Sequence, residues 1–297
     1  MKKNSFCGYL FLIMLTNIII LLLTACSNLE PVNPTNTAEP SKIPTVNLPP
    51  LLKDSYSVEV VELPYTSQLF LDVYAPSAEG IWPVVVVLHG GDDNKDWTSD
   101  LSKKIAAQGA VVFTPSWRIK SEVYFYQGYE DVACSIRFAR SKAHDYGGNP
   151  DRITVVGHSA GGGAAAAMFL AANGFEGDCL VSGGSSVPDA LVGLDGVYDF
   201  RELLSAEIYA KDPEGWDLIN PVFYLPSQQV NDDRVIYIIN SSFPLLQDDG
   251  LSFQEDLIRV GFDPKLILLP NVNHTSIAWP APDEVIQAVV DAMSTVD

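Results

Sequence analysis

The sequence predicts an α/β protein in which a mainly parallel, eight-stranded sheet carries helices on both of its faces. Residues 84–88, Val-Val-Val-Val-Leu, are apolar at every position, as expected for a strand buried on both faces. Short β-favouring runs then alternate with segments of helical periodicity. Residues 153–168 pass directly from a β-favouring run through a glycine-containing turn into an alanine-rich run. Because parallel strands need long crossovers, usually helices, this order favours a sheet covered on both sides.

The expected strands are short runs rich in β-branched and aromatic residues. They are residues 58–63, 69–74, 84–88, 110–114, 153–156, 190–194, 235–239 and 265–269. The first two flank a polar turn, so we expect them to pair antiparallel. The later runs are separated by longer segments, and we expect them to be parallel.

Helices are expected wherever apolar residues recur at helical spacing. Besides the alanine-rich run, they are residues 100–108, 129–146, 252–260 and 282–293. Gly109 suits the C-cap of the first of these, and Gly147 and Gly148 end the second. Residues 200–233 fit neither period, and we expect a small cap insertion there.

The first 53 residues differ in composition from the rest. Lys2 and Lys3 precede an apolar run at residues 10–23, which is short for a membrane span and typical of a signal peptide. The sequence Leu-Thr-Ala-Cys that ends at Cys26 resembles the bacterial lipobox, whose cysteine is lipidated and becomes the new N-terminus. An uncleaved N-terminal anchor is the alternative, and either one places the domain outside the cytoplasm.

These features predict three segments. Residues 1–25 form a lipoprotein signal peptide, residues 26–53 a lipidated cysteine and proline-rich tether, and residues 54–297 one folded domain. The expected location is the outer side of a bacterial membrane, to which a lipid on Cys26 anchors the chain.

Of the four cysteines, Cys7 would leave with the signal peptide and Cys26 would carry the lipid, so Cys134 and Cys179 remain. Because disulfides persist outside the cytoplasm, we predict that these two form a bridge, with two separate buried thiols as the alternative. Two cysteines without nearby histidines also argue against a zinc site.

The charge balance restricts the partners. The 297 residues contain 18 Lys and Arg against 37 Asp and Glu, a formal net charge of −19. Apart from Lys2 and Lys3 no basic run exists, so we expect no nucleic-acid partner.

The turn at residues 157–161, Gly-His-Ser-Ala-Gly, has the pattern of a nucleophile elbow. A sharp strand–turn–helix lifts the hydroxyl of Ser159 above the sheet edge, and its flanking glycines let strand and helix pass closely. Ala160 opens the following helix, where its N–H points to the place at which an oxyanion would form. The alternative is a glycine-rich packing turn with no catalytic role.

A nucleophilic serine needs a base, and the chain has four histidines. His158 lies inside the turn, and we expect that its side chain cannot serve the adjacent serine. His144 is expected at a helix end in solvent. His274 follows the last predicted strand, from which its loop can fold back over Ser159, so His274 is the predicted base. His89 begins the sequence His-Gly-Gly, and the N–H of Gly91 is predicted to complete the oxyanion hole.

The His-Gly-Gly sequence at 89–91, the elbow at 157–161 and Asn273-His274 occur in the order and spacing of the α/β-hydrolase superfamily. The chain resembles its small carboxylesterase branch and is similar to feruloyl and acetyl-xylan esterases. The resemblance implies an α/β-hydrolase fold and a serine esterase that works through an acyl-enzyme on a small or polymer-linked ester. It implies no metal and no organic cofactor, and it leaves the oligomeric state open.

Two positions depart from the family pattern. Asp92 stands where a third glycine is common, and Phe243 stands where the triad acid is expected after the strand 235–239. We predict Asp248 as the acid, with Asp195 and Asp249 as alternatives and a Ser–His dyad as a further one. A non-catalytic ligand-binding lipoprotein with a hydrolase fold is the competing hypothesis for the whole chain.

Overall fold

A computed structural model describes residues 46–53, 55–91, 93–119, 125–203, 209–228 and 234–294. The predicted signal peptide, Cys26 and most of the predicted tether therefore lie outside the described residues. Among the helices of the described segments, none is long and apolar enough to cross a membrane.

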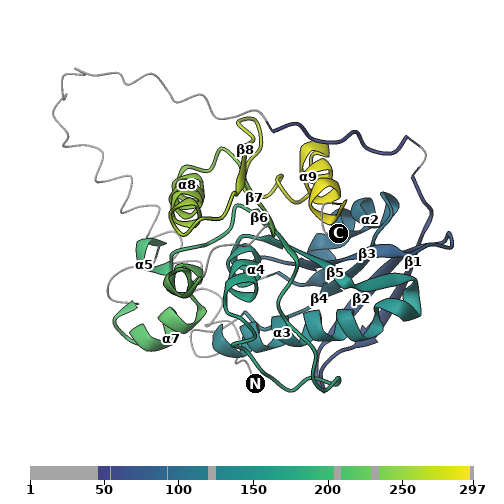
Figure 1. Ribbon diagram of the computed structural model, residues 1–297, viewed down its shortest axis with the longest axis horizontal. Helices are drawn as coiled ribbons and strands as arrows, with labels where there is room; N and C mark the ends of the chain where they lie inside the picture. Colours follow the sequence, from purple (N-terminus) through teal and green to yellow (C-terminus); the bar gives the residue numbers. More distant parts are fainter. Residues whose placement is uncertain are drawn as a thin grey trace, which may run out of the picture. The chain divides into compact units, whose positions relative to one another are not determined.

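The described chain is built on one eight-stranded sheet (Figure 1). Its strands are β1 (Val58–Pro64), β2 (Phe70–Pro76), β3 (Trp82–Leu88), β4 (Val111–Pro115), β5 (Gly148–His158), β6 (Ala190–Leu194), β7 (Val235–Asn240) and β8 (Lys265–Leu268). The spatial order is β1-β2-β4-β3-β5-β6-β7-β8. β2 pairs antiparallel with β1 and β4, and the remaining pairs are parallel. The predicted α/β fold class, with a mainly parallel eight-stranded sheet, is confirmed.

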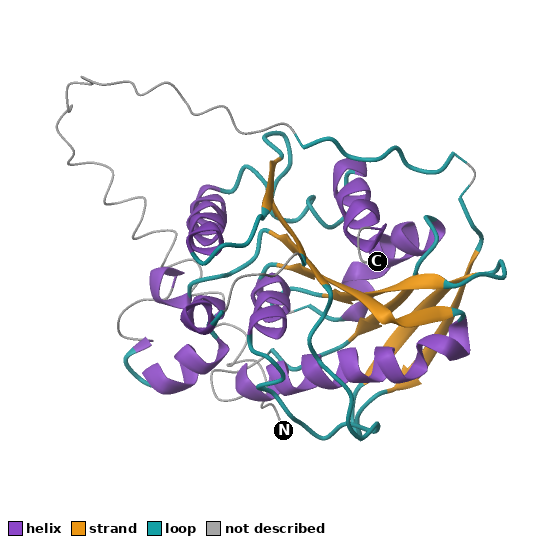
Figure 2. Ribbon diagram, viewed as in Figure 1, coloured by secondary structure: helices purple, strands orange, loops and turns teal. Residues whose placement is uncertain are grey.

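Helices cover both faces of the sheet, as Figure 2 shows. They are α2 (Ser99–Ala107), α3 (Phe125–Lys142), α4 (Ala160–Leu170), α5 (Phe200–Leu203), α7 (Pro213–Ile219), α8 (Pro244–Arg259) and α9 (Asp283–Ser294). The described residues also form three 3₁₀ segments, η1 (Lys95–Thr98) before α2, η2 (Ala143–Tyr146) after α3 and η3 (Pro221–Ser227) after α7.

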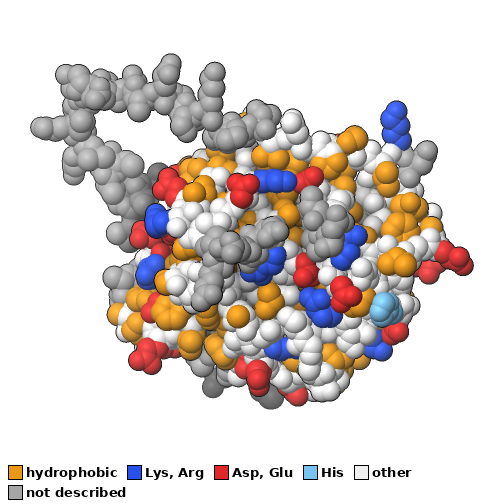
Figure 3. Space-filling model, viewed as in Figure 1, with side chains coloured by type: hydrophobic (Ala, Val, Ile, Leu, Met, Phe, Trp, Pro, Cys, Tyr) orange, Lys and Arg blue, Asp and Glu red, His pale blue; other side chains and the backbone are white. Residues whose placement is uncertain are grey.

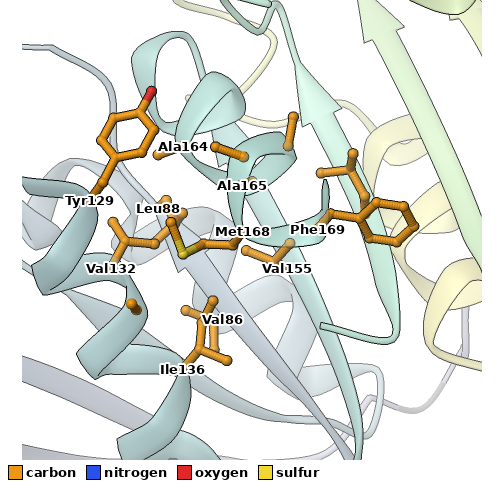
Figure 4. Close-up of a cluster of buried hydrophobic side chains, with 14 of the residues drawn as sticks. Val86, Leu88, Tyr129, Val132, Ile136, Val155, Ala164, Ala165, Met168 and Phe169 are labelled. Carbon is orange, nitrogen blue, oxygen red and sulfur yellow. The ribbon is translucent and has the colours of Figure 1, made fainter. Parts of the chain in front are cut away.

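Strand β3 is apolar at every position because its two faces enter two different cores. Val84, Val86 and Leu88 pack in the cluster that contains α3 and α4. Figure 4 shows Val86 and Leu88 in this cluster. Val85 and Val87 pack in the cluster that contains α2 and α9. Side chains of a strand alternate between its faces, so a strand covered on both sides has no polar positions.

Helix α8 differs from the sequence prediction. It begins at Pro244, eight residues before the predicted start at Ser252. Pro244 has no N–H to lose at the first helical position and its φ is already helical, so it starts the helix directly after β7. The stretch with Asp248 and Asp249 is therefore helix and not the loop that the sequence suggested.

The predicted insertion contains α5, α7 and η3 in its described part. Trp216, Ile219 and Leu225 are buried and join the core on the α3 and α4 side. The Trp216 ring packs 5.6 Å from that of Phe200, centroid to centroid. Core packing thus accounts for Trp216, while Phe223 in the same segment is exposed.

The structure contains the predicted disulfide between Cys134 in α3 and Cys179 in the segment between α4 and β6. It closes a loop with a sequence separation of 45. A bridge of that span restricts the unfolded chain, which predicts a stabilisation of about 4 kcal/mol. Replacing both cysteines with alanine should lower the free energy of unfolding by that order, measured by urea denaturation. Reduced wild type keeps both side chains and is the control for packing; equal midpoints for oxidised and reduced protein would contradict the prediction.

Candidate active site

Ser159 lies in the turn between β5 and α4, in a backbone conformation that is rare for residues other than glycine. Its φ is 55° and its ψ is −122°. The turn is tight: a Cβ on Gly157 would lie 2.1 Å from the carbonyl oxygen of Gly161. A Cβ on Gly161 would lie 2.4 Å from the carbonyl oxygen of His89. Both positions therefore require glycine, and the strained turn presents the hydroxyl at the carboxyl edge of the sheet.

His274 lies in the loop after β8 and contacts two side chains that are distant in sequence. Its Nε2 is 3.1 Å from Oγ of Ser159, which is 115 positions away. Its Nδ1 is 3.1 Å from Oδ2 of Asp195. The side-chain oxygen of Asn273 accepts the N–H groups of Thr275 and Ser276 and so shapes the turn around the imidazole. These contacts form a Ser–His–Asp chain of the kind used in nucleophilic catalysis.

Asp195 is fully buried just beyond the end of β6 and has a positive φ of 44°. Ser241, just beyond the end of β7, donates its backbone N–H to Oδ1 at 2.7 Å and its hydroxyl to Oδ2. Burial opposes ionisation of this carboxyl group, but the hydrogen bonds from His274 and Ser241 outweigh it, so the pKa of Asp195 is lowered. The site thus holds a carboxylate against Nδ1 of the imidazole.

The predicted acid Asp248 is not part of this chain of contacts. It is exposed on α8, because the helix that begins at Pro244 carries it away from His274. Asp249, the second alternative from the same stretch, is buried and accepts the backbone N–H groups of Tyr198 and Asp199. The assignment of Asp248 is therefore corrected to Asp195, which was an alternative in the sequence analysis.

Phe243 occupies the place of the expected acid as an aromatic neighbour of the imidazole. Its ring lies 5.6 Å from the ring of His274, centroid to centroid, and the residue is 43% exposed. Asp195 can replace an acid after β7 because β6 and β7 are adjacent and parallel, with Leu194 opposite Ile239. Their carboxyl ends therefore meet at the same edge of the sheet.

His89 orients the peptide that precedes the predicted oxyanion donor Gly91. Its Nε2 accepts the N–H of Trp117 at 3.2 Å, so in the neutral ring Nδ1 carries the proton and donates to the carbonyl oxygen of Gly90 at 2.8 Å. In a trans peptide C=O and N–H point in opposite directions, so the N–H of Gly91 points away from His89. Ala160 is the first residue of α4, where its N–H has no partner within the helix. Asp92 lies outside the described residues.

His158 has a structural role that the sequence analysis did not identify. Its Nε2 donates to the carbonyl oxygen of His274 at 2.8 Å, and its ring packs 4.6 Å from the His274 ring. Burial lowers the pKa of His158 to about 4, with a further contribution from His274. The sequence signal, a histidine directly before the nucleophile, was present, but the partner is a backbone carbonyl that only the fold brings near.

Asp249 is expected to make stability depend on pH. Burial raises the pKa of this carboxyl group from 3.8 to about 7. Because the folded value lies above the unfolded one, the contribution to stability is complete below about pH 4 and is lost as pH rises through about pH 7. A difference of about three pKa units corresponds to about 4 kcal/mol.

The comparison with Asp249→Asn isolates this effect. Between about pH 4 and about pH 8, the free energy of unfolding of wild type should fall by about 4 kcal/mol relative to that variant in urea titrations. Asp248→Asn changes the exposed neighbour on the same helix and is the control, with the same pH dependence as wild type. Parallel curves for wild type and Asp249→Asn would contradict the prediction.

A cavity of about 390 Å³ lies beside the catalytic contacts. It is lined by Asp93, Asn94, Asp96, Trp97 and Trp279. A Cβ on Gly90 would lie 3.3 Å from Oδ2 of Asp93 and 3.3 Å from Cβ of Ser159, so Asp93 in the cavity wall lies across Gly90 from the serine. Within the described segments, no group of three or more His, Cys, Asp or Glu side chains could hold a metal ion.

A larger cavity of about 690 Å³ lies elsewhere on the domain. Its lining includes the end of α4 and the residues just before β6 and β7, such as Asp189 and Arg234. Those are the amino ends of the parallel strands, at the edge opposite to Ser159. Arg234 and Arg140 in its wall donate to backbone carbonyls of the chain itself. This cavity is therefore not part of the candidate active site.

Comparisons with known proteins agree with this geometry. A probable isoprenylcysteine α-carbonyl methylesterase of Arabidopsis thaliana is 28% identical over 251 residues, covering 74% of this chain and 52% of its own length. The chain thus spans about half the length of that relative. The carboxylesterase NlhH of Mycobacterium tuberculosis is 27% identical over 213 residues, covering 65% of this chain and 66% of its own.

Solved structures share the fold at low identity. A truncated carbohydrate esterase from gut microbiota has a TM-score of 0.67 at 18% identity and covers 83% of this chain and 98% of its own. A thermostable esterase from Pseudomonas putida has a TM-score of 0.64 at 16% identity, and the match covers 84% of this chain and 86% of that structure's chain. A comparison with protein families matches residues 71–246, more than half of the chain, to BD-FAE. The chain therefore belongs to the BD-FAE family and has the α/β-hydrolase fold of such esterases.

Proposed function

We propose that this protein is a serine esterase of the carboxylesterase type that works through an acyl-enzyme. The observation that carries the proposal is the continuous chain of contacts from Oγ of Ser159 through His274 to Asp195, at 3.1 Å for each step. The family and the names of the relatives, a methylesterase and a carboxylesterase, support the reaction type.

We propose a role for each group. Nε2 of His274 takes the proton of Ser159 as Oγ attacks the ester carbonyl carbon, and Asp195 stabilises the resulting imidazolium. The N–H groups of Ala160 and Gly91 receive the oxyanion. His274 then gives its proton to the leaving alcohol, and a water molecule, deprotonated by His274, releases the acid from the acyl-enzyme.

The substrate class we propose is an ester of a carbohydrate, as in the feruloyl and acetyl-xylan esterases that the sequence resembles. The cavity beside Ser159 supports this, because indole rings pack against the apolar faces of sugars while carboxylate and amide groups bond their hydroxyls. Trp279 is 54% exposed, which leaves it available for such packing.

The proposed location is the outer side of a bacterial membrane, with the lipid on Cys26 as the anchor. The support comes from the sequence of residues 1–53 alone. Mass spectrometry of the N-terminal peptide should find a lipidated Cys26 as the first residue, and Cys26→Ser should leave the membrane fraction. An unmodified N-terminus beginning at Met1 would contradict the proposed anchor.

The esterase proposal is tested with the full chain in detergent. Wild type should hydrolyse p-nitrophenyl acetate and form one covalent adduct with a fluorophosphonate, at Ser159. Ser159→Ala should lose both, while Ser77→Ala, an exposed serine after β2, should retain both. Absence of turnover and of adduct in wild type would favour the non-catalytic ligand-binding alternative.

The carbohydrate class has its own test. Replacing Trp279 with alanine should raise KM for an acetylated xylo-oligosaccharide and leave p-nitrophenyl acetate hydrolysis nearly unchanged. Equal effects of Trp279→Ala on the two substrates would contradict the proposed sugar contact.

A further inference from the structure

The imidazole of His158 is buried next to the catalytic contacts and has no part in the reaction proposed above. The residue is 4% exposed. Its Nε2 lies 2.8 Å from the carbonyl oxygen of His274. Since a carbonyl can only accept, Nε2 carries the proton and Nδ1 holds the lone pair. Nδ1 is buried, and among the residues that the structure describes it has no hydrogen-bond partner.

His158 also stands between two aromatic rings. The Trp97 ring lies 4.6 Å from the His158 ring at 31°, and the His274 ring lies 4.6 Å from it at 34°. A Cβ on Gly90 would come within 3.0 Å of Nδ1, so the backbone before Gly91 closes that edge of the ring. His158 therefore lies against η1, the backbone at Gly90 and the loop that carries His274.

The contact matters because His274 is carried by a loop and not by a helix or strand. Its imidazole has to make two contacts at the same time. Nε2 lies 3.1 Å from Oγ of Ser159, and Nδ1 lies 3.1 Å from Oδ2 of Asp195. Two residues before His274, the loop is held by Ser242, whose backbone N–H donates to the carbonyl oxygen of Val272. The hydrogen bond from Nε2 of His158 holds the loop at residue 274 itself.

We propose that His158 is a positioning residue for the catalytic base: its Nε2–H holds the His274 carbonyl, and its ring, covered by Trp97, supports the imidazole within reach of Ser159 and Asp195. The inference rests on the proposed esterase function and goes beyond it, because it assigns a role in turnover to a residue that does not touch the substrate.

The ring has to stay uncharged during turnover, because a second cation would oppose the imidazolium that forms on His274. The charged or titratable groups that face His158 are His274, Asp195 and, across Gly90, the carboxylate of Asp93. Burial, with His274 as the next contribution, lowers the pKa of His158 to about 4. His158 therefore stays neutral and keeps its donor when His274 becomes an imidazolium beside it.

Two substitutions separate the donor from the ring. Glutamine places an amide N–H at about the reach of Nε2, whereas phenylalanine keeps a ring of similar size without a donor. His158→Phe should lower kcat about 100-fold with little change in KM, because a misplaced base impairs chemistry and not binding. His158→Gln should recover most of kcat. If the ring served packing alone, the order would be reversed, and Phe matching or exceeding Gln would overturn the proposal.

A measurement on wild type keeps the test independent of both variant folding and turnover. With ¹⁵N-labelled histidine in the full chain there are four imidazoles to assign. His158 should be the neutral Nε2–H tautomer from about pH 5 upward, with an Nε2 proton protected from exchange. A charged ring or an Nδ1–H tautomer at pH 7 would overturn the proposal. If wild type shows this state but neither turnover nor adduct at Ser159, the esterase function fails while the contact to His274 stands.

Discussion

Asp195→Asn is expected to lower kcat for p-nitrophenyl acetate about 10⁴-fold, with a small change in KM. The carboxylate of Asp195 fixes the tautomer of His274 through Nδ1 and stabilises the imidazolium that forms when Ser159 attacks. An asparagine amide can donate to Nδ1 and so favours the tautomer whose Nε2 carries a proton and cannot act as base. The loss should appear in single-turnover acylation as well as in kcat.

The matched control is Asp248→Asn. It makes the same chemical change on the exposed surface of α8 and should keep wild-type kcat. If Asp248→Asn lost activity and Asp195→Asn kept it, the acid assignment would be wrong. If both kept full activity, the protein would work as a Ser–His dyad.

His89→Phe is expected to lower kcat about 100-fold by disturbing the oxyanion hole. Without the Nδ1–H donor, the carbonyl of Gly90 is no longer held, and the N–H of Gly91 loses its fixed direction. The N–H of Trp117 also loses its acceptor, so a stability loss of about 1–3 kcal/mol should accompany the change. Rates are therefore to be measured well below the melting temperature.

His144→Phe is the control, because His144 is exposed in η2, directly after α3, and its replacement should leave kcat unchanged. A transition-state-like boronic or phosphonate ligand should lose affinity for His89→Phe by a factor similar to the loss in kcat. Unchanged kcat in a folded His89→Phe protein would mean that the orientation of Gly91 does not depend on His89.

Some of the features that these variants test can be predicted from local sequence patterns, and others cannot. The run at 84–88 and the alternation of strand and helix segments predicted the sheet, because burial on both faces and crossover length are encoded over a few residues. The elbow at Ser159 was predicted for a similar reason. Its glycines, strand and helix are contiguous, so the constraint that shapes the turn is local.

The acid could not be chosen in this way. The family pattern pointed to the stretch after β7, where Asp248 was favoured, but Pro244 begins a helix there and carries Asp248 into solvent. Asp195 follows β6, and its selection depends on the pairing of Leu194 with Ile239, which brings two strand ends together. Pairing of this kind is a contact between segments that are distant in the chain, and no local periodicity reports it.

The sequence by itself determined the fold class and the candidate nucleophile, base and His-Gly-Gly loop at 89–91, and it predicted the disulfide between Cys134 and Cys179 that the structure contains. The tertiary structure decided which carboxylate faces His274, and it gave His158 its backbone partner at residue 274. The physical reason is the range of the interactions involved. Strand burial and turn strain act between near neighbours, whereas the catalytic hydrogen bonds join loops that only the packed sheet edge brings within 3.1 Å.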